Sequence, residues 1–344
     1  GGLKDFSTRS QSDVLDILYA EERGGNATDI NSMWIVNAIS CKATRDVIYE
    51  LSSHPDILSI GYDKVVQIID DNESFEVKDE PATRGSAAPH VLQVRANQVW
   101  NQGYTGKNVI VAVLDSGTNI DHYDLKDHLW VGEVGGEKVN GWNYISNNSD
   151  IRDDFGHGTH CAGIVCGDGT VGNTVGVAPD ATLMTLKVVN RAGGGSPSAM
   201  MSGVQFAIEH GAQILSASLG FKISQIGVAA SESLRTTFVN ALDSGVIVCA
   251  AAGNDGNTYG APDNVDVPGS CPPPYLHDDQ TLKGGVSSVV CVGSVNSYNQ
   301  HVSTSSEGPS TWNRDGSSTY TDYVYNGTSM GLIRPDISAP GELV

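Results

Sequence analysis

Mostly continuous apolar runs, separated by polar and glycine-rich turns, recur along the chain beyond about residue 90. A run without polar alternation indicates a strand buried on both faces, as in a parallel sheet covered by helices. The runs are Val109–Leu114, Thr182–Val189, Ile214–Leu219, Val246–Ala250 and Val289–Val292. Helical patterns occur at His157–Val165 and at Ser198–His210, where Gly211 ends the second helix. The pattern predicts a doubly wound α/β fold, in which ligands bind beyond the carboxyl ends of the strands.

The chain before about residue 80 follows a different pattern, with short helical and strand-like segments. Ser12 is a candidate N-cap for a helix with one apolar side, and Thr44 for a second, shorter helix. The strand-like segments are Trp34–Cys41, Ile57–Ile60 and Val65–Ile69. This order predicts a small α+β unit with helices on one face of a sheet.

A polar stretch from Asp70 to Pro89 separates the two regions and lacks apolar periodicity. Such a stretch indicates an exposed linker. We therefore expect a first unit over residues 1–80, a linker over residues 81–89 and a second unit over residues 90–344.

Composition and charge narrow the classes of function. The chain has 344 residues, a net charge of -20 and an isoelectric point near 4.6. Nucleic-acid binding needs clustered Lys and Arg, so no nucleic-acid partner is expected. No apolar run is long enough to span a bilayer.

The cysteines are expected to be mostly buried thiols, because a domain of this size does not need a disulfide framework. A single bridge remains an open alternative. The residues are Cys41, Cys161, Cys166, Cys249, Cys271 and Cys291.

Three polar residues lie where this fold places its ligands. Asp115 follows an apolar run, His157 opens a helix within a Gly-His-Gly-Thr-His segment, and Asn254 ends another run through Ala-Ala-Gly. Each alone has an ordinary structural explanation, as a turn aspartate, a satisfied histidine or a turn asparagine. Together they match acyl-transfer chemistry: the carboxylate orients the imidazole, the imidazole moves a proton, and the amide stabilises an oxyanion.

The sequence resembles the subtilisin-like serine proteases, or subtilases, whose triad runs in the order Asp, His, Ser. The matching stretches span residues 113–341, which is nearly all of the second region. They are Val113–Gly117, His157–His160, Ser218–Gly220, Ala251–Asn254 and Asp336–Gly341.

The resemblance implies roles for these residues. Asp115 and His157 are then triad members, Asn254 is the oxyanion donor, and His160 is the second histidine of the motif and not the base. Two glycine-bearing edges would pair with the substrate backbone, and a third segment would line the pocket for the side chain before the cut bond. The edges are Gly193, Gly194, Gly195 and Ser218, Leu219, Gly220, and the pocket segment is Ala251, Ala252, Gly253.

The nucleophilic serine of the family lies in a Gly-Thr-Ser-Met-Ala motif, and Ser329 stands in a similar segment, Gly327–Met330. We nevertheless predict that Ser329 is not the nucleophile. In the family the Asp-Ile-x-Ala-Pro-Gly turn precedes the serine, whereas here Asp336–Gly341 follows it, and Pro335 prevents the long helix that the serine should open. The serine is expected beyond Val344, and residues 1–344 alone are expected not to acylate.

Subtilases are similar in carrying an N-terminal propeptide that assists folding and inhibits the enzyme. Residues 1–80 fit this description, with the closest similarity at Trp34–Ala38 and Ser53–Leu58. By analogy, the segment near Ile68, Ile69 and Asp70 would lie in the substrate cleft. The alternative is an ordinary accessory domain.

No cofactor is required by this chemistry, and calcium is the one ion to consider. Asp124 matches a calcium-binding aspartate of many subtilases, although the loop at Gly167–Val177 is shorter than in the family. Zinc is not expected, because Cys161 and Cys166 cannot both face a metal together with His157. The Gly-x-Gly-x-x-Gly match in the same loop follows a helix and lacks the lysine of a phosphate site.

The sequence therefore predicts a secreted, periplasmic or cell-surface serine endopeptidase precursor, a zymogen whose partners are a polypeptide substrate and its own propeptide. The start at Gly1 is typical of a processed or engineered end, so an export signal would not be in view. The alternative is a non-catalytic peptide-binding module that keeps the cleft. A Gly-Thr-Ser-Met-Ala motif beyond Val344 would favour the enzyme.

Overall fold

The computed structural model describes residues 2–69, 86–273, 287–312, 331–342 and 344. Its largest element is a 7-stranded sheet in which every pair of neighbouring strands is parallel. The strands, in order across the sheet, are β13 (Ile337–Pro340), β12 (Val290–Val295), β11 (Ile247–Ala251), β10 (Ile214–Ala217), β4 (Ile110–Asp115), β8 (Thr182–Lys187) and β7 (Gly141–Asn143). The predicted doubly wound parallel sheet is confirmed, and each predicted apolar run overlaps one of its strands.

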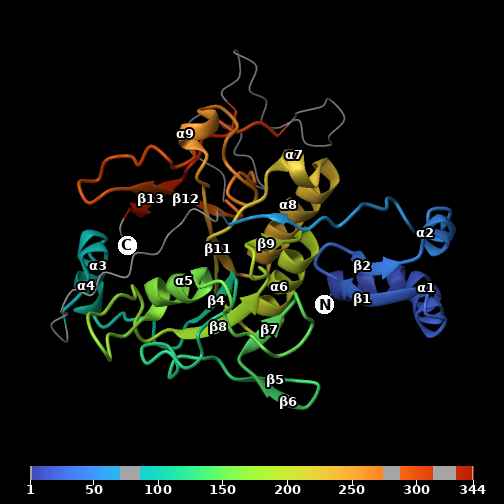
Figure 1. The fold of residues 1–344 in the computed structure, drawn as a ribbon, viewed down its shortest axis with the longest axis horizontal. Helices are drawn as coiled ribbons and strands as arrows, with labels where there is room; N and C mark the ends of the chain where they lie inside the picture. Colours follow the sequence, from blue (N-terminus) through green and yellow to red (C-terminus); the bar gives the residue numbers. More distant parts are fainter. Residues whose placement is uncertain (1, 70–85, 274–286, 313–330, 343) are drawn as a thin grey trace.

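Helices cover both faces of the sheet (Figure 1). Val111 and Val113 of β4 pack on one face against helix α5 (His157–Cys166). Ala112 and Leu114 belong to the core on the other face, which includes residues of α6 (Pro197–Glu209) and α8 (Val228–Asp243). Successive side chains of a strand point to opposite faces, so a central strand covered on both sides must be apolar throughout.

Two corrections concern these elements. The helix α8 was not expected from the sequence. The segment Asp336–Gly341, expected as a turn, contains the edge strand β13, which pairs with β12 from Val292↔Ile337 to Val295↔Pro340. The remaining short elements of this body are α3 (Pro89–Gln93), α4 (Ala96–Trp100), β5 (Gly132–Val134), β6 (Glu137–Val139), α7 (Ile223–Ile226) and α9 (Gly256–Tyr259).

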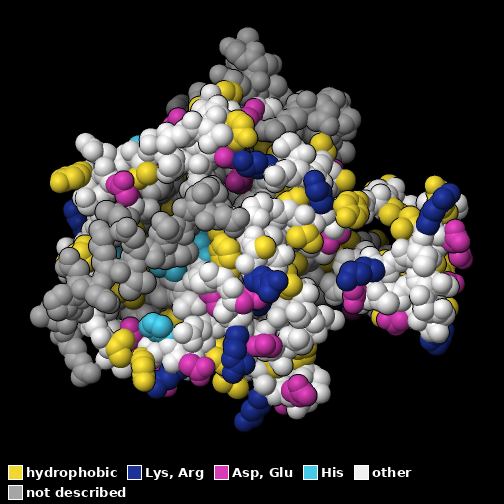
Figure 2. Space-filling view, in the orientation of Figure 1, with side chains coloured by type: hydrophobic (Ala, Val, Ile, Leu, Met, Phe, Trp, Pro, Cys, Tyr) yellow, Lys and Arg dark blue, Asp and Glu magenta, His cyan; other side chains and the backbone are white. Residues whose placement is uncertain are grey.

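The N-terminal residues form a lobe at the side of this body, which projects from it in the space-filling view (Figures 1 and 2). Its elements are α1 (Gly2–Arg23), β1 (Ala27–Met33), β2 (Ala38–Ala43) and α2 (Arg45–Leu51). The strands form an antiparallel hairpin. A small core of its own joins the helices to the hairpin, through Val14, Leu18, Ala27, Val47 and Leu51.

Several expectations for this lobe were wrong in detail. Ser12 is not an N-cap, because α1 begins near Gly2 and the Ser12 hydroxyl donates to Arg9 O within the helix at 3.0 Å. The expected strand Trp34–Cys41 is the turn of the hairpin followed by the start of β2. The segment Ile57–Ile60 forms no strand. An apolar run in a turn can pack against a neighbouring body, and local periodicity does not reveal that partner.

The turn of this hairpin docks on α6 and α8. Gln205 Oε1 accepts from Trp34 N at 2.8 Å and Ile35 N at 3.3 Å, and Asn240 Nδ2 donates to Ile35 O at 2.5 Å. The Ile35 side chain is fully buried in the core of the larger body. The apolar run around Trp34 is therefore explained by this contact.

All six cysteines are free. Burial raises the pKa of Cys271 and of Cys291 to about 12, so these thiols stay neutral at ordinary pH. Among the described residues, no helix is long and apolar enough to cross a membrane.

Candidate active site

The carboxylate of Asp115 and the imidazole of His157 are in direct contact. Asp115 is the last residue of β4 and His157 the first of α5, and their exposed fractions are 1% and 6%. Nδ1 of His157 lies 2.8 Å from Oδ1 and 2.9 Å from Oδ2 of Asp115. A carboxylate only accepts hydrogen bonds, so Nδ1 holds the proton and Nε2 is the basic nitrogen of the neutral ring.

This contact also sets the protonation of the imidazole. Burial alone would lower the pKa of His157, but the hydrogen bond to Asp115, the contact with Cys161 and the charge of Asp115 together outweigh it, and the pKa is raised. The pair therefore favours an imidazolium, which is the form that a proton-accepting base must reach during catalysis.

Cys161 lies on the same face of α5 as His157, one helical turn later. Its Sγ is 3.7 Å from Nδ1 and 4.0 Å from Nε2 of His157. Burial, together with the charge of Asp115, raises the pKa of this thiol, so it remains a neutral neighbour of the pair. The four-residue spacing within a predicted helix was the available sequence signal for this contact.

Asp115, His157 and Cys161 also form the one cluster of three metal-ligating side chains found in the described part of the chain, with donor atoms within 4.8 Å of one another. Cys166 is not a member, and its thiol donates to Ala162 O at 3.5 Å. The zinc set considered from the sequence is therefore not assembled by these residues.

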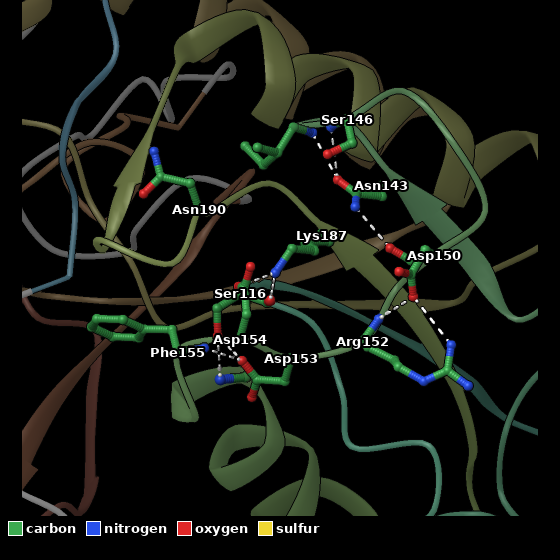
Figure 3. A network of polar contacts seen from close by, with 12 residues as sticks. Ser116, Asn143, Ser146, Asp150, Arg152, Asp153, Asp154, Phe155, Lys187 and Asn190 are labelled. Carbon is green, nitrogen blue, oxygen red and sulfur yellow. Dashed lines mark hydrogen bonds and ion pairs between the residues drawn. The ribbon is translucent and has the colours of Figure 1, made fainter.

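A hydrogen-bonded network holds the start of α5 against the end of β4 (Figure 3). Ser116 Oγ donates to Asp153 Oδ1 at 2.8 Å and accepts from Gly158 N at 2.9 Å. Asp153 also accepts from the main-chain N–H groups of Phe155 and Gly156 and from Thr159. Burial opposes ionisation, but these hydrogen bonds lower the pKa of Asp153 overall, so it stays charged. The carboxylate thereby fixes the turn that places His157.

Lys187, at the end of β8, reaches the same network (Figure 3). Its ammonium contacts Ser116 O and the carboxylate of Asp154, and the residue is 3% exposed. A buried ammonium needs such partners, because an unpaired buried charge is costly. Neither Asp153 nor Lys187 was singled out from the sequence, since neither belongs to a recognisable motif.

The remaining predicted residues lie on loops that follow neighbouring strands. Ser218, Leu219 and Gly220 come directly after β10, and Ala251 to Asn254 end β11 and begin its loop. Gly253 adopts φ +110°, a conformation that glycine tolerates, and Ser306 holds its loop, donating its N–H to Gly253 O at 2.8 Å. Parallel neighbours bring these strand ends to one edge of the sheet, together with Asp115.

The glycine edge at Gly193–Gly195 is paired with a strand from the N-terminal region. The strand β3 (Val66–Gln67) runs antiparallel to β9 (Gly194–Gly195), with Val66 opposite Gly195. Ile68 N donates to Gly193 O at 3.0 Å, and Gly220 N donates to Ile68 O at 3.4 Å. The chain at Ile68 therefore lies between the two edges that were predicted to hold a substrate backbone.

Of the two remaining predicted residues, Asp124 and Ser329, the structure describes only Asp124. Asp124 is 7% exposed, and its Oδ1 accepts from Val171 N at 3.0 Å. It belongs to no group of three or more metal-ligating side chains within the described ranges. Ser329 and its segment Gly327–Met330 lie outside the described residues.

The sequence that forms this site matches a known protein family. The family model Peptidase_S8, the subtilase family, matches residues 106–343. The chain belongs to the subtilase family. The match covers β4, α5 and every strand of the central sheet, so the Asp115–His157 contact lies within it.

Individual relatives agree with this assignment. Subtilisin DY from Bacillus licheniformis is 33% identical over 252 residues, which cover 73% of this chain and 81% of that protein. Subtilisin E from Bacillus subtilis (strain 168) is 29% identical across 100% of this chain and 78% of its own length. The minor extracellular protease Epr from the same organism is 30% identical over 90% of this chain and 43% of its own. This subtilase is therefore a subtilisin-family serine endopeptidase, whose substrate is a polypeptide.

Proposed function

We propose that this subtilase hydrolyses peptide bonds with a triad of Asp115, His157 and a serine, and with Asn254 as an oxyanion donor. The observation that supports this most strongly is the bond between His157 Nδ1 and the Asp115 carboxylate, with atoms 2.8 Å apart. It fixes the tautomer in which Nε2 is the base, and it stabilises the imidazolium that forms on proton transfer.

In the proposed reaction the serine Oγ attacks the carbonyl carbon of the scissile bond while His157 Nε2 takes the hydroxyl proton. The carbonyl oxygen becomes an oxyanion, to which the Asn254 side-chain amide donates a hydrogen bond. The imidazolium then gives its proton to the leaving amine, and the peptide C–N bond breaks. Water repeats the sequence on the acyl-enzyme, with His157 again accepting and returning the proton.

We assign the nucleophile to a serine C-terminal to Gly341 and not to Ser329. The order of motifs supports this, since Asp336–Gly341 precedes the serine in the family. The path of the chain is consistent with it, because Val344 O lies 2.9 Å from Nε2 of His160, on the same helix as His157. On this assignment residues 1–344 do not acylate by themselves.

We assign residues 1–80 to an inhibitory propeptide that blocks the substrate cleft. The pairing of β3 with β9 and the Gly220–Ile68 hydrogen bond support this, because they give the N-terminal segment the backbone contacts expected of a substrate. Val66, Ile68 and Ile69 are each less than 9% exposed, at 7%, 8% and 6%. A second unit over residues 90–344 would then be the catalytic domain, joined by the linker at residues 81–89.

Two further assignments concern location and calcium. The name of the relative Epr describes an extracellular protease, so we assign this chain to a secreted or cell-surface location. Calcium remains a proposal at Asp124, where main-chain and amide oxygens would have to complete the ligand set.

Kinetics of peptide hydrolysis by the protein as its gene encodes it test the proposed triad. Asp115→Asn should lower kcat by about 10⁴-fold, because the imidazole loses its orienting carboxylate.

Asn254→Ala should lower kcat by about 10²–10³-fold with little change in KM, because the donor acts on the transition state.

His160→Gln is the matched control, since it alters a histidine of the same motif that we place outside the proton path. It should keep most of the activity. Activity that survives Asp115→Asn undiminished would contradict the triad, and a folded protein that binds peptides but cleaves none would indicate the non-catalytic alternative.

A further inference from the structure

Asp266 lies on a segment that is hydrogen-bonded to both loops at the carboxyl edge of the sheet. Its main-chain N–H donates to Ala252 O at 3.0 Å. The next residue, Val267, pairs with Phe221 in both directions, at 2.7 and 2.9 Å. The side chain of Asp266 is therefore held between the loop that follows β10 and the loop that follows β11.

Two glycines face this carboxyl group. A Cβ added at Gly220 would come 2.5 Å from the Asp266 Cβ and 3.2 Å from Oδ2, and a Cβ added at Gly253 would come 2.9 Å from Oδ2. Any larger residue at either position would press on the carboxyl group. Gly220 belongs to a predicted substrate-binding edge and Gly253 to the predicted pocket for the side chain before the cut bond.

The charges around Asp266 leave its own charge incompletely compensated. In the described part of the chain no side chain donates a hydrogen bond to its carboxyl group, and Lys222 is paired with Asp255, with Nζ 2.9 Å from Oδ1 and 2.8 Å from Oδ2. The Lys222 ammonium also lies over the Tyr259 ring, 4.8 Å from its centroid.

Burial and the charge of Asp255 accordingly raise the pKa of Asp266 to about 7, and Lys222 only partly opposes this. A carboxyl group without a donor is costly in a purely structural role. Among the described residues, Asp266 therefore has neither a directly paired cation nor a hydrogen-bond donor.

We propose that Asp266 determines substrate specificity, by pairing with a Lys or Arg side chain in the substrate residue that precedes the cut bond. The inference rests on the proposed function, because it uses the substrate roles of Gly220 and Gly253. A guanidinium or ammonium group placed beside these glycines and next to the carboxyl group would supply the donors that Asp266 lacks. An apolar side chain would instead leave the carboxyl group buried and unpaired.

Peptide substrates that differ only in the residue before the scissile bond test this proposal. With the protein as its gene encodes it, kcat/KM should be higher for Arg and Lys than for Gln, Leu or Phe. Asp266→Asn, which keeps the shape and removes the charge, should lower kcat/KM for Arg and Lys on the order of 10- to 100-fold. It should change kcat/KM for Leu by less than about 3-fold. The ratio of kcat/KM for Arg to kcat/KM for Leu is measured on the same sample, so it does not depend on how much of the enzyme is folded.

Asp127→Asn, the same change at an exposed carboxylate, is the matched comparison and should leave the ratio unchanged. Equal loss for Arg and Leu in Asp266→Asn, or no loss for either, would overturn the proposal.

A protein that hydrolyses none of these substrates would contradict the proposed function and not the specificity. Binding of benzamidine, a cation, and of neutral benzamide then decides the specificity by calorimetry. Benzamidine should bind at least 10-fold more tightly to the unaltered protein, and Asp266→Asn should abolish the difference. Equal binding of the two probes to the unaltered protein would overturn the inference.

Discussion

Asp115 and Asp266 are carboxylic acids near the same sheet edge in opposite surroundings. Asp115 accepts from the His157 imidazole and from Ser116 N at 2.7 Å, so its charge is shared among donors. Asp266 has Asp255 as a neighbouring charge and no donating side chain in the described residues. The first arrangement suits a group that must stay ionised next to a base. The second suits a group that gains its partner from a ligand.

The raised pKa of Asp266 predicts how its replacement affects stability. A carboxyl group with a raised pKa in the folded state stabilises that state fully only below its unfolded pKa near 3.9, and the contribution is lost as pH rises through about 7. Asn has no charge to bury. Asp266→Asn should therefore raise the melting temperature relative to the unaltered protein, by a margin that grows from pH 4.5 to about 7 and then levels off.

Calorimetric melting of both proteins at pH 4.5, 6 and 8 measures that margin. Other titrating groups are shared by the two proteins, so they cancel in the difference. A margin that is constant or that shrinks with pH would show that Asp266 is not held in an unfavourable charged state.

The position of a single residue could be predicted from the sequence where its motif adjoins a recognisable strand or helix. Asp115 could be placed because it directly follows an apolar run, and His157 because small residues follow it in a helix. Asp266 could not be placed from the sequence, because its loop has no apolar periodicity. Its position against Gly220 and Gly253 is fixed by long-range main-chain hydrogen bonds of its segment to Phe221 and Ala252.

At the scale of elements, the central strands were predictable and the N-terminal lobe was less so. Strands such as β4 are buried on both faces, so their continuous apolar sequence is itself the signal. The run at Trp34–Cys41 is apolar for another reason, since Ile35 packs into the body between α6 and α8. The strand candidate Val65–Ile69 was present only in part, as β3, and its partner is β9 and not the hairpin of its own lobe.

The docking of the hairpin turn should hold the segment at Ile68 in place. Gln205 accepts from two main-chain N–H groups of the turn, and Gln205→Ala leaves these donors without their partner, a loss of about 1–3 kcal/mol. The hairpin turn and the segment at Ile68 belong to one lobe. If the turn is released from α6 and α8, the effective concentration of the Ile68 segment at β9 falls. Amide exchange at Trp34, Ile35, Ile68 and Ile69 should accelerate by about 10-fold in Gln205→Ala.

Hydrogen exchange with mass-spectrometric readout on residues 1–344 measures this effect. Gln102→Ala, the same change at an exposed position, is the matched control and should leave all four amides unchanged. Acceleration at Trp34 and Ile35 with none at Ile68 would show that the two contacts are independent, and would remove the hairpin from the proposed inhibition.

At the scale of the whole molecule, the lobe, the segment at β3 and the sheet edge form one arrangement. The lobe rests on α6 and α8, and its outgoing chain pairs with β9 in a separate two-stranded sheet (Figure 1). The Asp115–His157 pair lies at the end of β4 in the central sheet. Under the proposed propeptide role, this segment would block the cleft until it leaves. This arrangement depends on contacts between distant parts of the chain, which is why only the family resemblance predicted it.

The central claim is that His157 serves a serine other than Ser329. A fluorophosphonate reagent, which phosphonylates an activated serine with loss of fluoride, should label the protein as its gene encodes it. Peptide mapping should place the label on a serine C-terminal to Gly341. Ser329→Ala should keep the label and His157→Ala should lose it. A label on Ser329, or one that persists without His157, would contradict the account.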